Sequence, residues 1–435
     1  MADREQLAHL LRRATFGPRA EEVDAAEKAG YTATLDALFS PGTADAGAAR
    51  TPPPALGADP GRVAAGATRD QRQQARQARA AQVKQVARWW VDRMTQADHQ
   101  LLEKLTFFWH GHWATSAQKV QVAQLMLQQR QTLSDTALGD RGTQVRAMLR
   151  DPALIIWLDG QKNTAQAPNE NLARELMELF TLGIGHYTEY DVKAGAKALT
   201  GWTVDEATGT ATFRPKRHDG STKTILGHTG AFDADGFAGV LLAQPANAEF
   251  IARRLWFRYA GGDPMPDAVL HAATPQTTTA GMLRAVLAAA EFQRTAGHLV
   301  KQPVEWLVGA MRQLDIRPGA LKADEQQQLL GVLDQLGQVP LEPPSVGGWP
   351  ANAAWLTTSA AQGRLRAAQS LATKASVVVV QALGAVPAAQ RPDGLARVLV
   401  VDSFTARTRK VLEEAGSDPR RLLALGLASP EYTVS

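Results

Sequence analysis

The chain has 435 residues, of which 45% are hydrophobic and 21% charged, a composition typical of folded globular proteins and not of disordered ones. Its net charge of +4 is spread over 47 basic and 43 acidic residues, so no nucleic-acid partner is expected. The absence of cysteine excludes disulfides, thiolate metal sites and cysteine nucleophiles.

The N-terminal sequence MADREQLAHLLRRATFG has acidic residues at its front and no apolar segment, so it is not a signal peptide as written. No run of 18 or more apolar residues occurs, so no membrane span is expected. As written, these features favour a cytoplasmic protein.

Hydrophobic periodicity predicts an all-α protein, a large multi-helix domain with a small β-hairpin insertion. We expect an N-terminal helical segment at 1–40, an Ala/Pro/Gly-rich loop at 41–70, and a main helical domain at 71–435 with the hairpin at about 202–228. The helices are predicted at 4–13, 19–29, 31–39, 69–109, 118–134, 143–150, 169–182, 189–199, 247–259, 278–290, 301–315, 323–335, 360–374, 403–414 and 418–428.

The first part of the 69–109 helix, RDQRQQARQARAAQVKQVARWW, is charged and Ala-rich. Acidic residues and glutamines interrupt its arginines, which favours a solvated helix over a nucleic-acid-binding arm.

The stretch HQLLEKLTFFWHGHWATS, residues 99–116, combines histidines, a carboxylate and aromatic residues. His99, Glu103 and His110 fall within about 40° of one another on a helical projection, and His112 follows His110 by two residues. Imidazoles among aromatic rings are partly desolvated, which suits a neutral metal ligand or a proton shuttle. The alternative is a helix end whose histidines cap carbonyls or pack in the core.

The stretch NENLARELMELFTLGIGHYTEYDV, residues 169–192, places Glu175 at the edge of a leucine stripe and Glu178 one turn further along. A carboxylate against apolar surface resists ionisation unless it meets a cation or a donor. Glu175 is therefore predicted to be a metal ligand or catalytic acid supported by Glu178, or the partner of a distant arginine. Asn171 and Tyr187 are candidate substrate donors.

Alternation of Thr and Val with polar residues predicts a β-hairpin or long structured loop over 202–228. It includes the polar segment RHDGSTKTILGH, in which His218 is a candidate substrate-binding residue. A Pro/Gly loop at 339–359 carries Trp349 and Trp355, and it is predicted to be a packed lid or a stacking surface for sugar rings or another flat ligand.

Walker A, G-x-G-x-x-G, G-x-S-x-G and H-E-x-x-H motifs are absent from the sequence. Three functions stay open. The first is a metal-dependent hydrolase or oxidoreductase, with Glu103, His110, His112 and Glu175 holding a divalent metal and Glu175, Glu178 and His110 catalytic. The second is a glycan-active or glycan-binding protein that uses paired carboxylates and Trp349. The third is a non-catalytic assembly partner of an exported protein.

Nine stretches between residues 9 and 432 resemble the DUF1800 family, a bacterial family whose name records an unknown function: HLLRRATFGP, EKLTFFWHGHWATS, NENLARELMELFTLGIGHYTEYDV, ALTGW, HDGSTKTILG, ANAEFIARRLWFRY, VKQPVEWLVGAMRQL, VGGWPANAAW and LASPEY. The resemblance implies a largely helical protein from a family that is often exported and frequently encoded beside proteins resembling sulfatases and alkaline phosphatases. That neighbourhood implies a protein partner. The chain departs from the family pattern at AQPANAEF, where Gln244–Pro245 replaces the usual His-Pro, so a role for a histidine there does not carry over.

Overall fold

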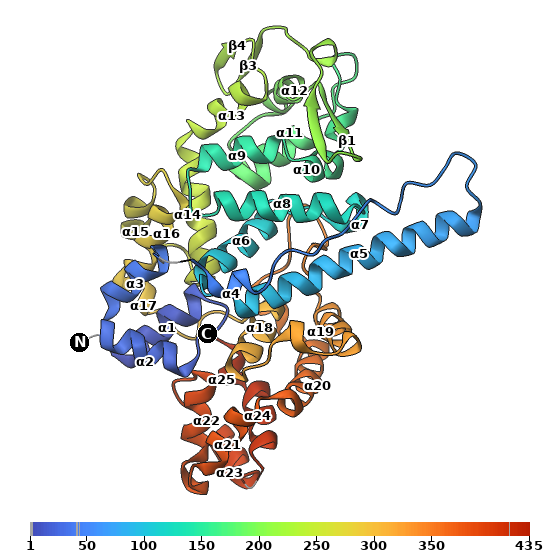
Figure 1. The fold of residues 1–435 in the computed structure, drawn as a ribbon. Helices are drawn as coiled ribbons and strands as arrows, with labels where there is room; N and C mark the ends of the chain where they lie inside the picture. Colours follow the sequence, from blue (N-terminus) through green and yellow to red (C-terminus); the bar gives the residue numbers. More distant parts are fainter. Residues whose placement is uncertain (1–2, 41, 43, 417) are drawn as a thin grey trace.

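A computed structural model describes residues 3–40, 42, 44–416 and 418–435 of the chain (Figure 1). Helices dominate these residues, and the strands form two small antiparallel pairs. The predicted all-α fold class is confirmed. None of the helices in these ranges has both the length and the apolar character that a membrane crossing requires.

The helices of the first half of the chain are α1 (Arg4–Ala14), α2 (Ala20–Ala29), α3 (Tyr31–Phe39), α4 (Ala46–Ala49), α5 (Arg69–Gln96), α6 (Gln100–His112), α7 (Ala117–Val120), α8 (Ala123–Thr136), α9 (Arg141–Leu149), α10 (Pro152–Trp157), α11 (Asn171–Glu175) and α12 (Glu189–Ala198). Those of the second half are α13 (Ala234–Leu242), α14 (Pro245–Tyr259), α15 (Asp267–Ala273), α16 (Thr279–Ala288), α17 (Ala290–Gln293), α18 (Pro303–Gln313), α19 (Ala323–Gln335), α20 (Thr358–Lys374), α21 (Val377–Ala385), α22 (Arg391–Leu399), α23 (Ala406–Glu414), α24 (Pro419–Ala428) and α25 (Pro430–Thr433).

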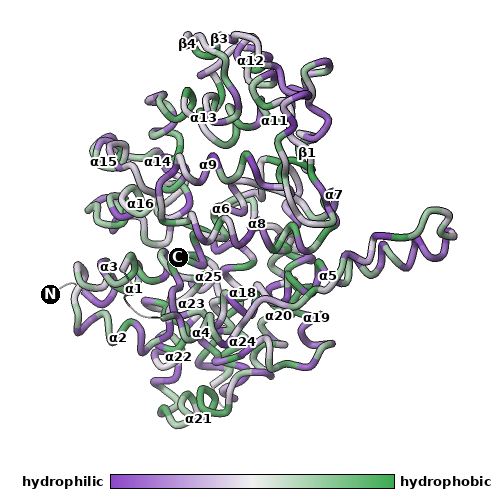
Figure 2. The backbone as a smooth tube through the Cα atoms, turned by 45° about the horizontal axis from the view of Figure 1, so that its top comes forward, coloured by the Kyte–Doolittle hydropathy of each residue, from purple (hydrophilic) through white to green (hydrophobic). Residues whose placement is uncertain are grey.

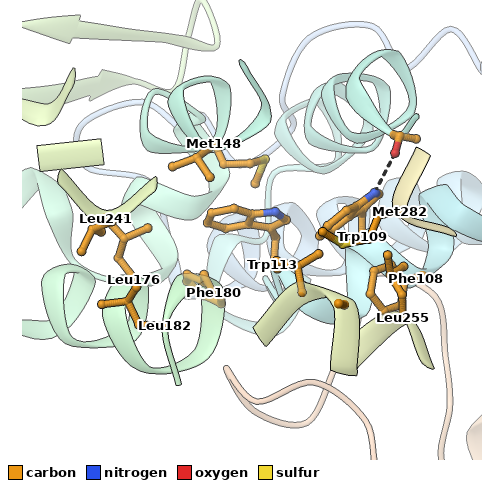
Figure 3. Packing of buried hydrophobic residues seen from close by; sticks show 14 of the residues in the cluster. Phe108, Trp109, Trp113, Met148, Leu176, Phe180, Leu182, Leu241, Leu255 and Met282 are labelled. Atoms are coloured by element: carbon orange, nitrogen blue, oxygen red, sulfur yellow. Dashed lines mark hydrogen bonds between the residues drawn. The ribbon is translucent and has the colours of Figure 1, made fainter. Parts of the chain in front are cut away.

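Helix α6 lies at the centre of the molecule and is buried on nearly every side (Figure 1). Its aromatic residues pack into two large apolar clusters, one toward α9–α16 and one toward α18–α24. Figure 3 shows Phe108, Trp109 and Trp113 in the first cluster, with the Trp109 indole N–H donating to the Ala137 carbonyl at 3.0 Å. A helix that is covered all round must satisfy every polar side chain that it carries within the protein.

The predicted single helix over 69–109 is wrong, because the chain breaks between α5 and α6. The Asp45 carboxylate accepts the backbone N–H groups of Asp98 (2.9 Å) and His99 (3.0 Å) at this break. Asp45 also caps the short helix α4 inside the stretch predicted as a loop at 41–70, of which positions 41 and 43 lie outside the described residues. This long-range contact, which local periodicity does not contain, takes up two backbone N–H groups at the junction of α5 and α6.

The predicted β-hairpin insertion is present as two hairpins. Strands β1 (Trp202–Asp205) and β2 (Thr210–Phe213) pair Trp202 with Phe213, and β3 (Lys223–Ile225) and β4 (His228–Gly230) pair Lys223 with Gly230. A short 3₁₀ turn at Pro215–Arg217 lies between them. Both hairpins lie at the end of the molecule that holds α11–α13 (Figure 1).

A buried ion network joins α6, α14 and α18. Glu305 of α18 accepts from the Lys104 ammonium of α6 at 2.6 Å and lies 3.0 Å from the Arg258 guanidinium of α14. Burial alone would raise the pKa of Glu305, but Arg258 and Lys104 outweigh it and hold that pKa well below its usual value. The carboxylate therefore stays charged and ties three central helices together.

Replacing Glu305 by Gln leaves two buried cations facing a neutral group, so we expect the free energy of unfolding to fall by about 3–5 kcal/mol. Urea unfolding measures this loss. The matched control is Glu189→Gln, which removes a surface partner of Arg174 and should change stability far less. Equal losses in the two variants would show that the Glu305 network is not a main contributor to stability.

Candidate functional site

The residues predicted as metal ligands do not converge in the structure. The Glu103 carboxylate is buried and accepts from the Arg130 guanidinium at 2.5 and 2.6 Å, which is the ion pair with a distant arginine that a buried acid requires. His110 and His112 are two residues apart on one helix, so their side chains point about 200° apart. In the described ranges, no group of three or more His, Cys, Asp or Glu side chains is placed to hold a metal ion. The predicted ligand set of Glu103, His110, His112 and Glu175 is thus not gathered into one cluster in these ranges, and its metal-binding role stays a prediction.

His110 anchors the loop that was predicted to be a lid. Its Nε2 atom accepts the backbone N–H of Leu341 at 3.0 Å, and its ring lies edge-on to Trp349 with centroids 5.3 Å apart. Burial lowers the pKa of His110 to about 3, so the imidazole is neutral at physiological pH and able to accept this bond. The contact ties α6 to the 339–359 loop.

His112 holds the end of a π-helical segment, Leu176–Thr181. Its Nε2 atom donates to the Phe180 carbonyl at 3.0 Å, and the Asn247 amide donates to the Thr181 carbonyl at 3.0 Å. Burial, together with the charge of Arg254, lowers the pKa of His112 well below its usual value. Both histidines thus satisfy backbone groups, as the alternative interpretation of the 99–116 stretch proposes.

The second predicted group remains together. Glu175 and Glu178 are half-buried near the end of α11, and the Tyr187 hydroxyl donates to Glu178 at 2.5 Å. Burial, reinforced by the Glu178 charge, raises the pKa of Glu175. Asn171 is exposed and donates to the Leu158 carbonyl at 3.3 Å. Catalytic roles for Glu175 and Glu178, and substrate contacts for Asn171 and Tyr187, stay predictions.

The remaining candidate residues, His218, Trp349 and Trp355, lie in different surroundings. His218 is half-buried beside the hairpins, where its Nδ1 atom lies 3.1 Å from both the hydroxyl and the carbonyl oxygen of Thr200. Trp355 is buried, with 4% of its surface exposed, so it offers no stacking surface. Trp349 is half-buried and stacks on Phe107, with ring centroids 5.5 Å apart.

An open pocket of about 380 Å³ lies against the C-terminal half of α6 and one face of α14. Its aromatic lining consists of Phe107, Phe108, Phe250, Phe257 and Trp349. Three arginines of α14 also line it, namely Arg253, Arg254 and Arg258. The rest of the wall is formed by Gly111, Leu299, Val300, Gln302, Gly347, Ala351 and Asn352.

The three arginines differ in their partners. Arg258 is neutralised by Glu305, and exposed Arg253 lies 4.0 Å from Glu249. Arg254 lies over the Phe250 ring, 5.7 Å from its centroid, and no carboxylate of the described residues comes within ion-pair distance of it. Burial lowers the pKa of Arg254 with no opposing charge, although a guanidinium stays protonated at neutral pH. The pocket therefore presents a partly desolvated cation that no carboxylate of the described residues neutralises.

Three close contacts fix the walls of the pocket. Gly348 has φ of 84°, and a Cβ atom at this position would collide with the Gly111 carbonyl oxygen, so the backbone of the Trp349 loop rests directly on α6. On the other wall, Asn352 accepts the Val300 N–H at 3.0 Å. The C-terminal residue Ser435 donates its N–H to the Leu299 carbonyl at 2.8 Å.

The pocket lies where four of the stretches that carry the family resemblance meet. Every lining residue except Leu299 belongs to one of these four stretches, which are EKLTFFWHGHWATS, ANAEFIARRLWFRY, VKQPVEWLVGAMRQL and VGGWPANAAW. Sequence reasoning identified Trp349 but missed the arginines. The sequence signal for these arginines is the run ARRLWFR within a predicted helix, because this spacing puts Arg254 and Arg258 one turn apart on one face of the helix.

The geometry defines a class: a mainly helical protein with an arginine- and aromatic-lined pocket against its central helix. The chain belongs to the DUF1800 family, described as a protein of unknown function, and the family model matches residues 9–434. A search of curated proteins and of solved structures found no match to the chain.

Replacing His110 by Gln keeps an acceptor for the Leu341 N–H but removes a buried titratable ring. The pKa of His110 is about 3 in the folded protein against 6.5 for a free histidine, so between these pH values only the unfolded state gains the proton. The free energy of unfolding therefore falls as pH drops through this window, by up to about 1.4 kcal/mol per pH unit. Urea unfolding at about pH 7, 6 and 5 should show a smaller loss in His110→Gln than in the wild type.

The control for this measurement is His186→Gln, at an exposed position, whose pH profile should follow the wild type. An unchanged profile in His110→Gln would mean that the folded protein protonates His110 as readily as the unfolded chain does.

Proposed function

We propose that this chain binds small anionic compounds that carry a flat, largely apolar ring, with the ring among the pocket aromatics and the anionic group on Arg254. The observation that carries the proposal is the partly desolvated Arg254, which has no counter-ion among the described residues, in a pocket walled by five aromatic side chains. An incoming carboxylate or phosphate would supply the missing charge and accept the charge-assisted hydrogen bonds that a guanidinium donates.

Buried charge behind the pocket wall supports an anionic ligand. Lys104 and Arg13 lie behind Arg258, and Glu305 is the carboxylate that opposes them. Burial lowers the pKa of Lys104 to about 8, with Glu305 opposing and Arg258 adding to the decrease. Excess positive charge in a low-dielectric interior attracts anions into a neighbouring cavity.

The polar side chains that line the pocket favour an aromatic acid over a sugar as the ligand. The Asn352 side-chain oxygen already accepts the Val300 N–H, and the Gln302 side-chain oxygen already accepts from the Gln338 side-chain amide at 2.9 Å. Few side-chain amides are therefore left for the hydroxyl groups of a sugar, whereas five aromatic rings offer stacked or edge-on contacts to a flat ligand.

This proposal replaces the metal-centred hypothesis, because Glu103, His110 and His112 already bind other groups of the protein. It retains Trp349 from the glycan hypothesis. The glycan hypothesis requires a pair of carboxylates, but the charged residues that line the pocket are arginines.

The test is calorimetric titration with benzoate, phenyl phosphate, glucuronate and uncharged benzamide. We expect the two anionic aromatic compounds to bind, and Arg254→Gln to weaken them about 10- to 100-fold, the effect of losing a charged hydrogen bond of about 1.5–3 kcal/mol. Affinity should fall with added salt.

Arg366→Gln is the matched control, since Arg366 is exposed on α20 and does not line the pocket. Unchanged affinity in Arg254→Gln, or equal binding of benzamide and benzoate, would contradict the proposal. Tighter binding of glucuronate than of benzoate would favour the glycan hypothesis instead.

A further inference from the structure

A second feature lies outside the pocket. The N-terminal half of α5 and the segment before it project from the body as an arm, residues 57–82 (Figures 1 and 2). The preceding segment packs along the arm helix at Ala75 and Ala78. From position 69 to position 82 of the helix no side chain is buried. The arm therefore contributes little to the core, and its sequence is free to serve another purpose.

Most of the chain's excess positive charge is on this arm. Residues 57–82 hold five arginines and two aspartates, a net charge of +3 against +4 for all 435 residues. Asp59 is bound to Arg79. Three of the other arginines, Arg69, Arg72 and Arg76, have no carboxylate of the described residues within ion-pair distance.

The arginines form a stripe along one face of the helix. Arg69, Arg72, Arg76 and Arg79 are spaced by three and four residues and fall within about 80° on a helical projection. The glutamines and alanines between them lie mainly on other faces. A stripe of this kind offers an extended row of donors to carboxylates arranged along a partner segment.

The stripe leads into a small pocket at the base of the arm. This pocket of about 190 Å³ is lined by Arg76, Arg79 and Lys84 together with Ala80 and Val83 of α5. Its remaining wall is Ala117, Gln118, Gln121 and Glu342. Because Asp59 already pairs with Arg79 and Glu342 already contributes a carboxylate to the wall, Arg76 and Lys84 are the cations of this pocket that we assign to an acidic side chain of a segment lying along the stripe.

We infer that the arm is a docking element for an acidic segment of a partner protein, which lies along Arg69–Arg79 and places one carboxylate in the basal pocket. The chain outside the arm is nearly neutral, so a long polyanion would find no continuing basic surface. Val63 is the large apolar residue exposed on the arm, which is too little to insert into a bilayer. A protein segment of matching length and opposite charge remains the best fit.

The experiment measures fluorescence anisotropy of a labelled 20-residue helical peptide of Glu and Ala with the full-length protein in about 50 mM salt, where exposed charges are weakly screened. The test variant carries Arg69→Glu, Arg72→Glu and Arg76→Glu. The control carries Arg366→Glu, Arg407→Glu and Lys410→Glu, exposed cations away from the arm with the same total change in charge. Melting curves check that both variants are folded.

We expect the peptide to bind the wild type, binding to weaken at least tenfold in the arm variant, and less than twofold in the control. Equal weakening in both variants, or no peptide binding to the wild type, would overturn the inference. Tighter arm-dependent binding of a 20-base-pair DNA duplex or of phosphatidylserine vesicles than of the peptide would also overturn it. This result is independent of the ligand pocket, which the arm does not touch.

Discussion

The burial of α6 on nearly every side is the constraint on which the rest of the structure depends. Water does not reach its polar side chains, so each must find a partner within the protein. Glu103 forms an ion pair with Arg130, and Lys104 forms one with Glu305. His110 accepts a backbone N–H from the 339–359 loop, and His112 donates to a backbone carbonyl. Residues that look like a metal centre in the sequence therefore act as the connections between the central helix and its neighbours.

The same connections build the pocket. Glu305 holds Arg258 and thereby orients α14, whose adjoining arginine, Arg254, is left without a carboxylate of the described residues. His110 holds the 339–359 loop, and Trp349 of that loop stacks on Phe107 in the pocket wall. Arg258 is thus neutralised within the protein, whereas Arg254 is the cation that the proposed anionic ligand would neutralise.

The fold class and most helices were predictable, because amphipathic periods and Pro/Gly positions are local properties. The break before α6 was not, since the side chain that binds its backbone N–H groups is Asp45, more than fifty residues earlier in the chain. For the site, Glu103 and His110 could be singled out from the sequence as buried polar residues. Their partners could not, because these partners come from distant segments of the chain. Arg254 escaped notice because an arginine beside a second arginine on a helix usually faces solvent, and only packing shows that this one is half-buried beside Phe250.

The most direct test of the account is the position of a bound anionic ring. Crystals of the protein soaked with 4-bromobenzoate would locate the bromine by its anomalous scattering. The account predicts a bromine peak among Phe250, Phe257 and Trp349 with the carboxylate on Arg254. A peak beside Glu175 and Tyr187, or no ordered ligand in the pocket at concentrations that saturate binding in solution, would contradict it.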